Sequence, residues 1–183
     1  MFIRIETDRL ILRPMLLTDV DDLLEYQSNP EIVRYIPWPQ RTMEQVKKAA
    51  EAVIKTCTFQ LNENKDFIVL VWELKSSRKV IGQSNMMLVS KENKCANIGW
   101  VTHQDFQRQG YAFEATKALL NYAFTNTDVH RIIADIDTRV HESAALAEKL
   151  GMRREATFLD GEFFKGEWCD LWLYAILKRE FQA

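Results

Sequence analysis

The chain has 183 residues, of which 47% are hydrophobic and 27% are charged, and its formal net charge at pH 7 is −2. This length provides a core for one domain, and the absence of linker-like stretches and internal repeats predicts a single domain over residues 1–183. The mixed charge without a basic block argues against nucleic acid as a ligand, and the lack of a signal sequence or a long apolar run predicts a soluble cytoplasmic protein without membrane contact.

The first elements are a short strand and a helix. Residues 10–12 are apolar and stop at Pro14, which cannot donate to a strand ladder, so we expect a strand there. Thr18 is the predicted N-cap of a helix that follows. Asn29-Pro30 is predicted to close this helix.

A loop with large side chains separates this helix from the next. Residues 35–39 contain two prolines, each of which pushes the preceding residue toward extended backbone. Thr42 and Gln45 form a capping-box pair. A second helix is therefore expected from this pair to about Cys57.

Three strands are predicted in the middle of the chain. Residues 67–74 are almost wholly apolar and rich in branched and aromatic residues, as expected of a strand buried on both faces. Residues 80–89 and 96–102 continue as strands, joined by a polar turn. Together they predict an antiparallel meander.

The second half of the chain is predicted to contain alternating helices and strands. A helix is expected over residues 111–125, a strand over 131–136 and a short helix over 143–150. Two final strands are expected over residues 152–158 and 171–177. The fold class predicted from the whole chain is mixed α and β, with a β-α-β-α unit in the second half.

Gly110 lies between a predicted strand and a predicted helix, where unpaired N–H groups and the helix dipole favour an anion. A glycine allows a pyrophosphate to approach the backbone, Ala112 is small, and Arg108 offers a charge-assisted contact. A glycine at a helix start is also a common structural feature. The chain lacks the Lys-Ser/Thr of a P-loop and the Gly-x-Gly-x-x-Gly of a dinucleotide fold.

Ordered motifs along nearly the whole chain resemble the GCN5-related N-acetyltransferase (GNAT) superfamily, within it the ribosomal-protein N-terminal acetyltransferase (RimJ/RimL-like) branch. The family's loop motif Gln/Arg-x-x-Gly-x-Gly/Ala is met by Gln107, Gly110 and Ala112. The matching segments are Thr7-Asp8-Arg9-Leu10-Ile11-Leu12-Arg13-Pro14, Val80-Ile81-Gly82, Ile98-Gly99-Trp100-Val101, residues 107–115, His130-Arg131-Ile132, Glu148-Lys149-Leu150-Gly151-Met152 and Trp168-Cys169-Asp170.

The resemblance implies a GNAT fold, with a mostly antiparallel, twisted sheet of about seven strands and about four helices, splayed at the middle strands. It implies acetyl-CoA as cosubstrate, with the pyrophosphate on the backbone amides of residues 108–113 and the pantetheine arm in the splay. The residues assigned to cofactor binding are Trp100, Val101, Gln107, Arg108, Gln109, Gly110, Tyr111, Ala112 and Phe113. No metal is required.

The chain departs from the family pattern at one position. The family commonly has Asn-x-x-Ser after the fifth strand, whereas this chain has Val140-His141-Glu142-Ser143. One side-chain contact to the cofactor is therefore in doubt, and His141 either replaces it or is a solvated helix-terminal histidine.

The resemblance also implies catalytic roles. Glu162 aligns with a glutamate proposed as general base, although an exposed structural acid is an equal alternative. Ser143 is the candidate proton donor to the departing thiolate, and a helix cap is its alternative. Cys57, Cys95 and Cys169 lack disulfide or zinc spacing and are expected to be core thiols.

Tyr35, Trp38 and Phe164 are predicted to wall the acceptor pocket, because the loops that carry them border that side in the family. Ordinary core packing is the alternative for these aromatic residues. Asp170 is expected to be structural or to orient the substrate.

The predicted function is direct acetyl transfer to a primary amine, either a protein N-terminus or a small molecule. A coenzyme A-binding module without turnover and a nucleotide-binding domain are the alternatives. The sequence leaves the acceptor open, and both a monomer and a homodimer are compatible with it.

Overall fold

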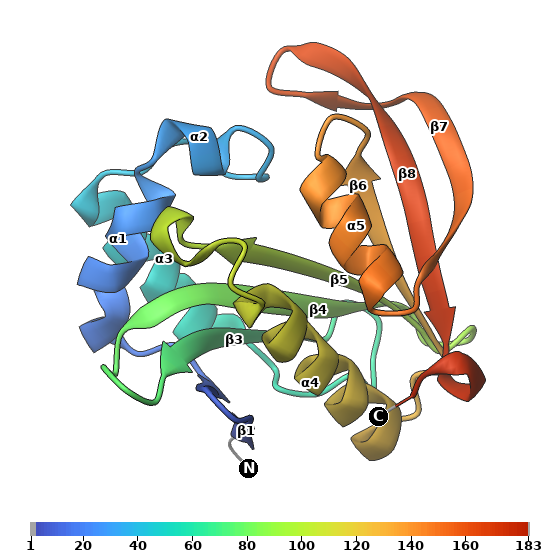
Figure 1. Cartoon of the computed structure of the whole chain (residues 1–183), viewed down its shortest axis with the longest axis horizontal. Helices are drawn as coiled ribbons and strands as arrows, with labels where there is room; N and C mark the ends of the chain where they lie inside the picture. Colours follow the sequence, from blue (N-terminus) through green and yellow to red (C-terminus); the bar gives the residue numbers. More distant parts are fainter. Residues whose placement is uncertain (1–2, 183) are drawn as a thin grey trace.

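A computed structural model describes residues 3–182 as an eight-stranded sheet flanked by helices (Figure 1). The strand order is β1-β2-β3-β4-β5-β6-β8-β7, and neighbours are antiparallel except for the parallel pair β5 and β6. The strands are β1 Ile5–Glu6, β2 Leu10–Arg13, β3 Phe67–Leu74, β4 Val80–Ser90, β5 Cys95–Thr102, β6 Arg131–Asp137, β7 Arg153–Phe164 and β8 Glu167–Leu177.

Five α-helices lie within the described residues, and none of them is long and apolar enough to cross a membrane. They are α1 Val20–Gln27, α2 Pro30–Val33, α3 Met43–Thr56, α4 Tyr111–Asn126 and α5 His141–Lys149. Short 3₁₀ turns cover Leu17–Asp19, Gln104–Phe106 and Lys178–Glu180.

The two faces of the sheet are covered by different helices, because side chains alternate along each strand. On β3, Ile68 and Leu70 belong to the core that α4 and α5 cover, whereas Val69 and Val71 belong to the core under α1 and α3. Figure 1 shows α4 and α5 in front of the sheet. The N-terminus of α4 therefore lies on one face of the sheet, and α1 and α3 cover the other.

The parallel pair β5 and β6 is short. Pairing joins Cys95–Asn97 to Arg131–Ile133 and stops there, although β5 continues to Thr102 and β6 to Asp137. Beyond this point the two strands separate in a V, while β6 stays paired to β8 along its whole length. The splay expected at residues 98–102 is confirmed.

The final strands form a long hairpin that projects above α5 (Figure 1). A bulge of Leu159, Asp160 and Gly161 interrupts the pairing between Phe158 and Glu162. A Cβ on Gly161 would come within 2.8 Å of the Cβ of Phe158, so the bulge requires glycine there. The strands are longer than the predicted ranges 152–158 and 171–177, because residues of mixed polarity, most of them exposed, continue the ladder without apolar alternation.

Most of the predicted elements are confirmed, including the capping box of Thr42 and Gln45, the meander of β3, β4 and β5, and the β-α-β-α unit. The prediction that Thr18 caps α1 was wrong. Thr18 lies inside a 3₁₀ turn, and the carboxylate of Asp19 accepts from the N–H of Leu16 instead. The two-residue β1 and the four-residue α2 are too short to show periodicity and were not predicted.

The helix expected over residues 143–150 begins two residues earlier, at His141, and ends at Lys149. Ser143 is therefore the third residue of α5 and not its cap, which is Val140. Its predicted alternative role as a helix cap was wrong.

Candidate active site

The loop between β5 and α4 presents a row of backbone donors. Gly110 is the N-cap of α4 with φ of 83°, and Arg108 also has a positive φ, 59°. The first intrahelical bond runs from the N–H of Glu114 to the carbonyl of Gly110. Within residues 3–182, no carbonyl or side chain accepts a hydrogen bond from the N–H groups of residues 108–113. These groups and the positive end of the α4 dipole form a site for an anion.

Glu114 ties this loop to the N-terminal strands. Its carboxylate accepts from the hydroxyl of Thr7 at 2.6 Å, the N–H of Arg9 at 2.8 Å and the Nε of Arg9 at 2.6 Å. Burial alone would raise the pKa of Glu114, but these hydrogen bonds outweigh it and the pKa lies below its usual value. The same guanidinium donates to the carbonyl of Gln109 at 3.0 Å and stacks 4.1 Å from the ring of Tyr111. Arg9 therefore fixes the end of the loop and the first turn of α4.

A buried histidine fixes the start of the loop. Nδ1 of His103 accepts from the N–H of Asp105 at 3.2 Å, which leaves Nε2 to donate to Glu25 of α1 at 2.8 Å. The side chain of Gln107 donates to the carbonyl of Thr102, and that of Gln109 donates to the carbonyl of Asp105. The two glutamines thus shape the loop from within it.

The N-terminal turn of α5 faces this loop. The guanidinium of Arg108 is 3.7 Å from the carboxylate of Glu142, and both side chains are highly exposed. Such an exposed pair contributes little stability, so Arg108 is free to turn toward an anion. The hydroxyl of Ser143 has no hydrogen-bond partner among the described residues, and Val140 packs against the core under α4 and α5.

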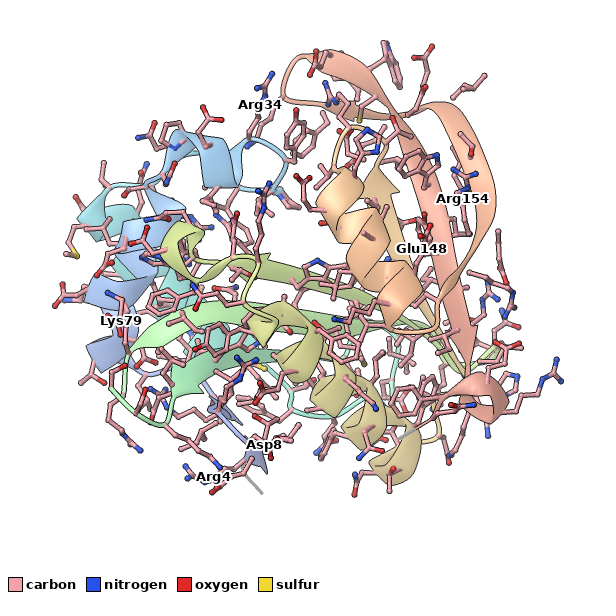
Figure 2. All side chains as sticks on the ribbon, in the orientation of Figure 1. Arg4, Asp8, Arg34, Lys79, Glu148 and Arg154 are labelled. Atoms are coloured by element: carbon pink, nitrogen blue, oxygen red, sulfur yellow. The ribbon has the colours of Figure 1, made fainter. Side chains whose placement is uncertain are left out.

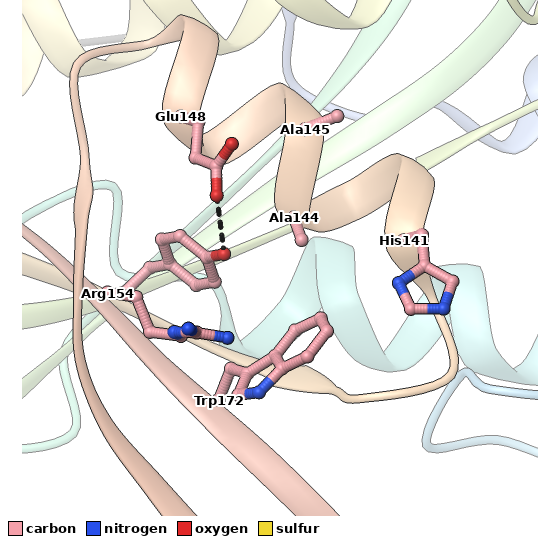
Figure 3. A pocket seen from close by; sticks show the side chains of 7 residues that line it. His141, Ala144, Ala145, Glu148, Arg154 and Trp172 are labelled. Atoms are coloured by element: carbon pink, nitrogen blue, oxygen red, sulfur yellow. Dashed lines mark hydrogen bonds between the residues drawn. The ribbon is translucent and has the colours of Figure 1, made fainter.

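His141 lines a cavity of about 460 Å³ between α5 and the β7–β8 hairpin (Figure 3). Its ring lies 5.7 Å from the ring of Trp172, and in the same cavity the hydroxyl of Tyr174 donates to Glu148 at 2.9 Å. Figure 2 shows Glu148 and Arg154 on facing elements of this region.

The predicted acceptor-pocket residues lie where the tip of the β7–β8 hairpin, residues 164–167, meets the loop that follows α2, residues 34–42. This segment is called the α2 loop below. Nζ of Lys165 donates to the carbonyl of Val33 at 2.5 Å and to that of Trp38 at 3.0 Å, and lies 5.2 Å from the ring of Phe164. The guanidinium of Arg139 lies 5.1 Å from the ring of Tyr35. These contacts connect the tip of the hairpin to α2 and the loop after it, and this connection is called the arch below.

Glu162 lies on β7, opposite Cys169, and its side chain is exposed. The thiol of Cys169 is buried and donates to the carbonyl of Glu162 at 3.3 Å. Burial, the largest cause, and nearby carboxylates raise the pKa of Cys169, which is consistent with a core thiol. Asp170 accepts from the N–H of Asp160 at 2.8 Å and so holds the bulge, a structural role.

All three cysteines are free thiols, and no three His, Cys, Asp or Glu side chains of residues 3–182 gather in a metal-binding arrangement. Trp100 and Val101 lie on β5 beyond the point where pairing with β6 ends. Ala112 and Phe113 pack against the core in the first turn of α4.

Two parts of this region are not predicted by the sequence patterns. The Thr7, Arg9 and Glu114 contacts span more than 100 residues, although all three lie in segments that matched the family. The contact between Asn97 on β5 and Asp135 on β6, 2.6 Å, was also missed. Only the parallel pairing, which no local pattern encodes, brings those two residues together.

A loop with free N–H groups at the start of α4 lies beside an opening between two parallel strands, and comparison with known proteins shows the class to which the chain belongs. Residues 9–153 match the family described as Acetyltransferase (GNAT) domain, which is more than half of the chain. The chain is 33% identical over 181 residues to the N-acetyltransferase YnaD of Bacillus subtilis, covering 96% of this chain and 98% of that protein. The chain belongs to the GNAT acetyltransferase family.

Two solved structures show how far the fold agrees. A GNAT-family acetyltransferase from Bacillus anthracis superposes with a TM-score of 0.87 at 29% identity, covering 97% of this chain and all of that one. RimL, the ribosomal L7/L12 α-N-protein acetyltransferase in complex with coenzyme A, superposes with a TM-score of 0.83 at 19% identity, covering 96% and 98%. The mixed α/β GNAT fold expected from the sequence is confirmed.

Proposed function

We propose that this protein transfers the acetyl group of acetyl-CoA directly to a primary amine in a ternary complex. The row of free N–H groups at residues 108–113, beside the opening between β5 and β6, is the observation that supports the proposal. The free N–H groups fit a pyrophosphate. The opening between β5 and β6 fits the extended pantetheine arm, which forms hydrogen bonds as a strand does. The whole domain is one catalytic unit in this proposal.

In the proposed complex the loop residues Gln107, Arg108, Gln109 and Gly110 and the helix residues Tyr111, Ala112 and Phe113 surround the pyrophosphate. Their backbone amides supply the hydrogen bonds, and the exposed guanidinium of Arg108 adds charge. Trp100 and Val101 line the pantetheine arm, because the backbone of β5 has no partner strand on that side.

The reaction requires a neutral amine, a stabilised oxyanion and a proton for the leaving thiolate. Backbone donors of β5 near Val101 serve the oxyanion. Ser143, whose hydroxyl has no partner among the described residues, is the proposed proton donor to the thiolate. Glu162 remains the carboxylate that the family resemblance assigns as base.

Tyr35, Trp38 and Phe164 are the proposed walls of the acceptor pocket, on the arch that Lys165 closes. The protein RimL, of the same fold, acetylates a protein N-terminus. Protein N-termini and small-molecule amines are both acceptors to test, since the aromatic walls provide no feature that excludes either.

An amine panel tests the proposal, with thiol release and product mass as readouts. The panel contains peptides with N-terminal serine or alanine, a polyamine and an amino sugar. The proposal predicts acetylated product and stoichiometric thiol for at least one of them. Binding of acetyl-CoA without product from any amine would instead support the coenzyme A-binding module.

A further inference from the structure

The strand β6 forms one wall of the V, and its side chains alternate between the two faces of the sheet. Ile132, Ala134 and Ile136 are buried in the core that α4 and α5 cover. Asp135 and Asp137 therefore point to the opposite face, where the α2 loop with Trp38 packs. Both aspartates lie beyond the last residue of β6 that pairs with β5.

The negative charge of Asp137 is compensated by an ion pair with Arg139. Arg139 contacts it through Nη2 at 2.6 Å and Nε at 2.9 Å. Burial alone would raise the pKa of Asp137, but the hydrogen bonds from Arg139 outweigh it and the pKa lies below its usual value. Such a carboxylate is a weak base at neutral pH.

Asp135 differs in each of these respects. Its carboxylate accepts one hydrogen bond, from the amide of Asn97 across the V at 2.6 Å, and no cationic side chain of residues 3–182 lies within 4 Å of it. Partial burial between the strands raises the pKa of Asp135, while the Asn97 amide opposes the rise. Asp135 is nevertheless an exposed residue and is accessible to water.

Few charged or titratable groups surround Asp135. On β5 the nearest is the buried thiol of Cys95, and on β6 they are Asp137 and Arg131, whose guanidinium is paired with Glu155. The residue opposite Asp135 on β8, Leu173, carries no charge. Asp135 is thus an unneutralised carboxylate in the wall of the V.

We infer that Asp135, oriented by Asn97, is the catalytic base that takes the proton from the acceptor ammonium, directly or through one water. This inference rests on the proposed acetyl transfer. The carboxylate lies roughly 7 Å along β6 from the vertex at Ile133, inside the opening. A pantetheine arm that enters the V from the α4 side would end at this position with its thioester. The acceptor amine would reach the thioester from the opposite face of the sheet.

The protons balance in this scheme. The ammonium gives one proton to Asp135, and the neutral nitrogen attacks the thioester carbon. The C–N bond forms and the C–S bond breaks, and the second proton of the nitrogen passes, by way of the Ser143 hydroxyl, to the departing sulfur. Asp135 then releases its proton to water, so one proton leaves for each acetyl group transferred.

Glu162 is less well placed for this role. It lies on β7, with β8 between it and β6. Its partner Cys169 is four residues from Leu173, the partner of Asp135, which separates the two carboxylates by roughly 13 Å along the sheet. Glu162 therefore borders the outer part of the acceptor rather than the reacting nitrogen.

The test is the pH dependence of kcat/KM, measured with whichever panel amine the wild type acetylates best. Four variants are compared: Asp135→Asn, Asn97→Ala, Glu162→Gln and, as a matched control on the same strand and face, Asp137→Asn. Calorimetric titration with CoA and thermal melting are measured for each, so that lost turnover is separated from lost folding or cofactor binding.

The inference predicts that Asp135→Asn lowers kcat/KM about a hundredfold at neutral pH and moves the loss of activity on lowering the pH up to the pKa of the amine itself, with CoA affinity unchanged. The rate of this variant recovers at high pH, where the free amine predominates. Asn97→Ala keeps the low-pH loss but moves it to higher pH, because the donor that lowers the pKa of Asp135 is gone. The control Asp137→Asn keeps the wild-type profile. Glu162→Gln tests the competing assignment of the base and is expected to keep the loss of activity at low pH.

Retention of the wild-type rate and profile by folded Asp135→Asn would overturn the inference, and so would a profile abolished by Glu162→Gln alone. If Asp135→Asn does not fold, an unmoved profile in Asn97→Ala overturns it. Failure of the wild type to acetylate any amine is a different result, visible before any variant is measured, and it refutes the proposed function itself.

Discussion

Gly110 has a backbone conformation that side chains with a Cβ rarely adopt, at the point where the proposed pyrophosphate meets the loop. Gly110→Val is expected to weaken CoA binding at least tenfold, because the side chain strains the turn and occupies the space above the amides. Calorimetric titration with CoA measures this. Gly151→Val is the matched control, since Gly151 has a similar φ, 87°, at the far end of α5. Equal losses of affinity in both variants would refute the assigned role of the loop.

At this scale the sequence predicts backbone roles better than side-chain roles. Gly110 and the capping box of Thr42 could be predicted because their signals are local. The positions of His141 and Ser143 depend on where α5 begins, a difference of two residues that turns each side chain by more than half a helical turn. Asp135 carried no signal, since its partner lies on another strand.

Contacts between the N-terminal segment and α4 hold the β5–α4 loop in place, and Glu114 accepts three of these hydrogen bonds. Glu114→Gln is expected to lower the free energy of unfolding by about 1–2 kcal/mol, because charge-assisted hydrogen bonds to Thr7 and Arg9 are weakened. CoA affinity should fall as well. Since the folded-state pKa of Glu114 is lowered, the wild-type advantage is present above the unfolded-state pKa and is lost as pH falls through the folded value. Urea unfolding at pH 7 and at pH 3.5 measures it, and an equal advantage at both would contradict the explanation.

The arch between the hairpin and the α2 loop depends on one ammonium group. Lys165→Met keeps the aliphatic stem and removes the donors to the carbonyls of Val33 and Trp38. We expect KM for the amine to rise about tenfold while CoA affinity stays constant, because only the acceptor side loses its tie. Steady-state kinetics with each substrate varied in turn measures this. Exposed Lys91→Met, which loses only a surface pair with Glu63, is the control and should leave both values unchanged.

The extent of each element was predictable only where its pattern is local. The bounds of β3 agree with the apolar run over residues 67–74, and α4 agrees within one residue. The hairpin β7–β8 extends well beyond its predicted strands, because residues such as Glu162 and Trp168 are exposed on both sides of the ladder and lack a buried face.

For the whole molecule, the interrupted pairing of β5 and β6 is the central feature. The order of strands and helices follows from the sequence, but the point at which the pairing stops does not. It is set by long-range packing, with β6 held by β8 along seven residues and β5 held by β4. The V was therefore foreseen through the family resemblance and not through residue patterns.

A crystal structure of the protein with CoA bound tests the account most directly. The account predicts pyrophosphate oxygens within hydrogen-bonding distance of the N–H groups of residues 108–113, and the pantetheine arm between β5 and β6 with its sulfur on the side of Asp135. Pyrophosphate elsewhere, for example in the cavity lined by His141 and Arg154, or a pantetheine arm outside the V, would contradict it.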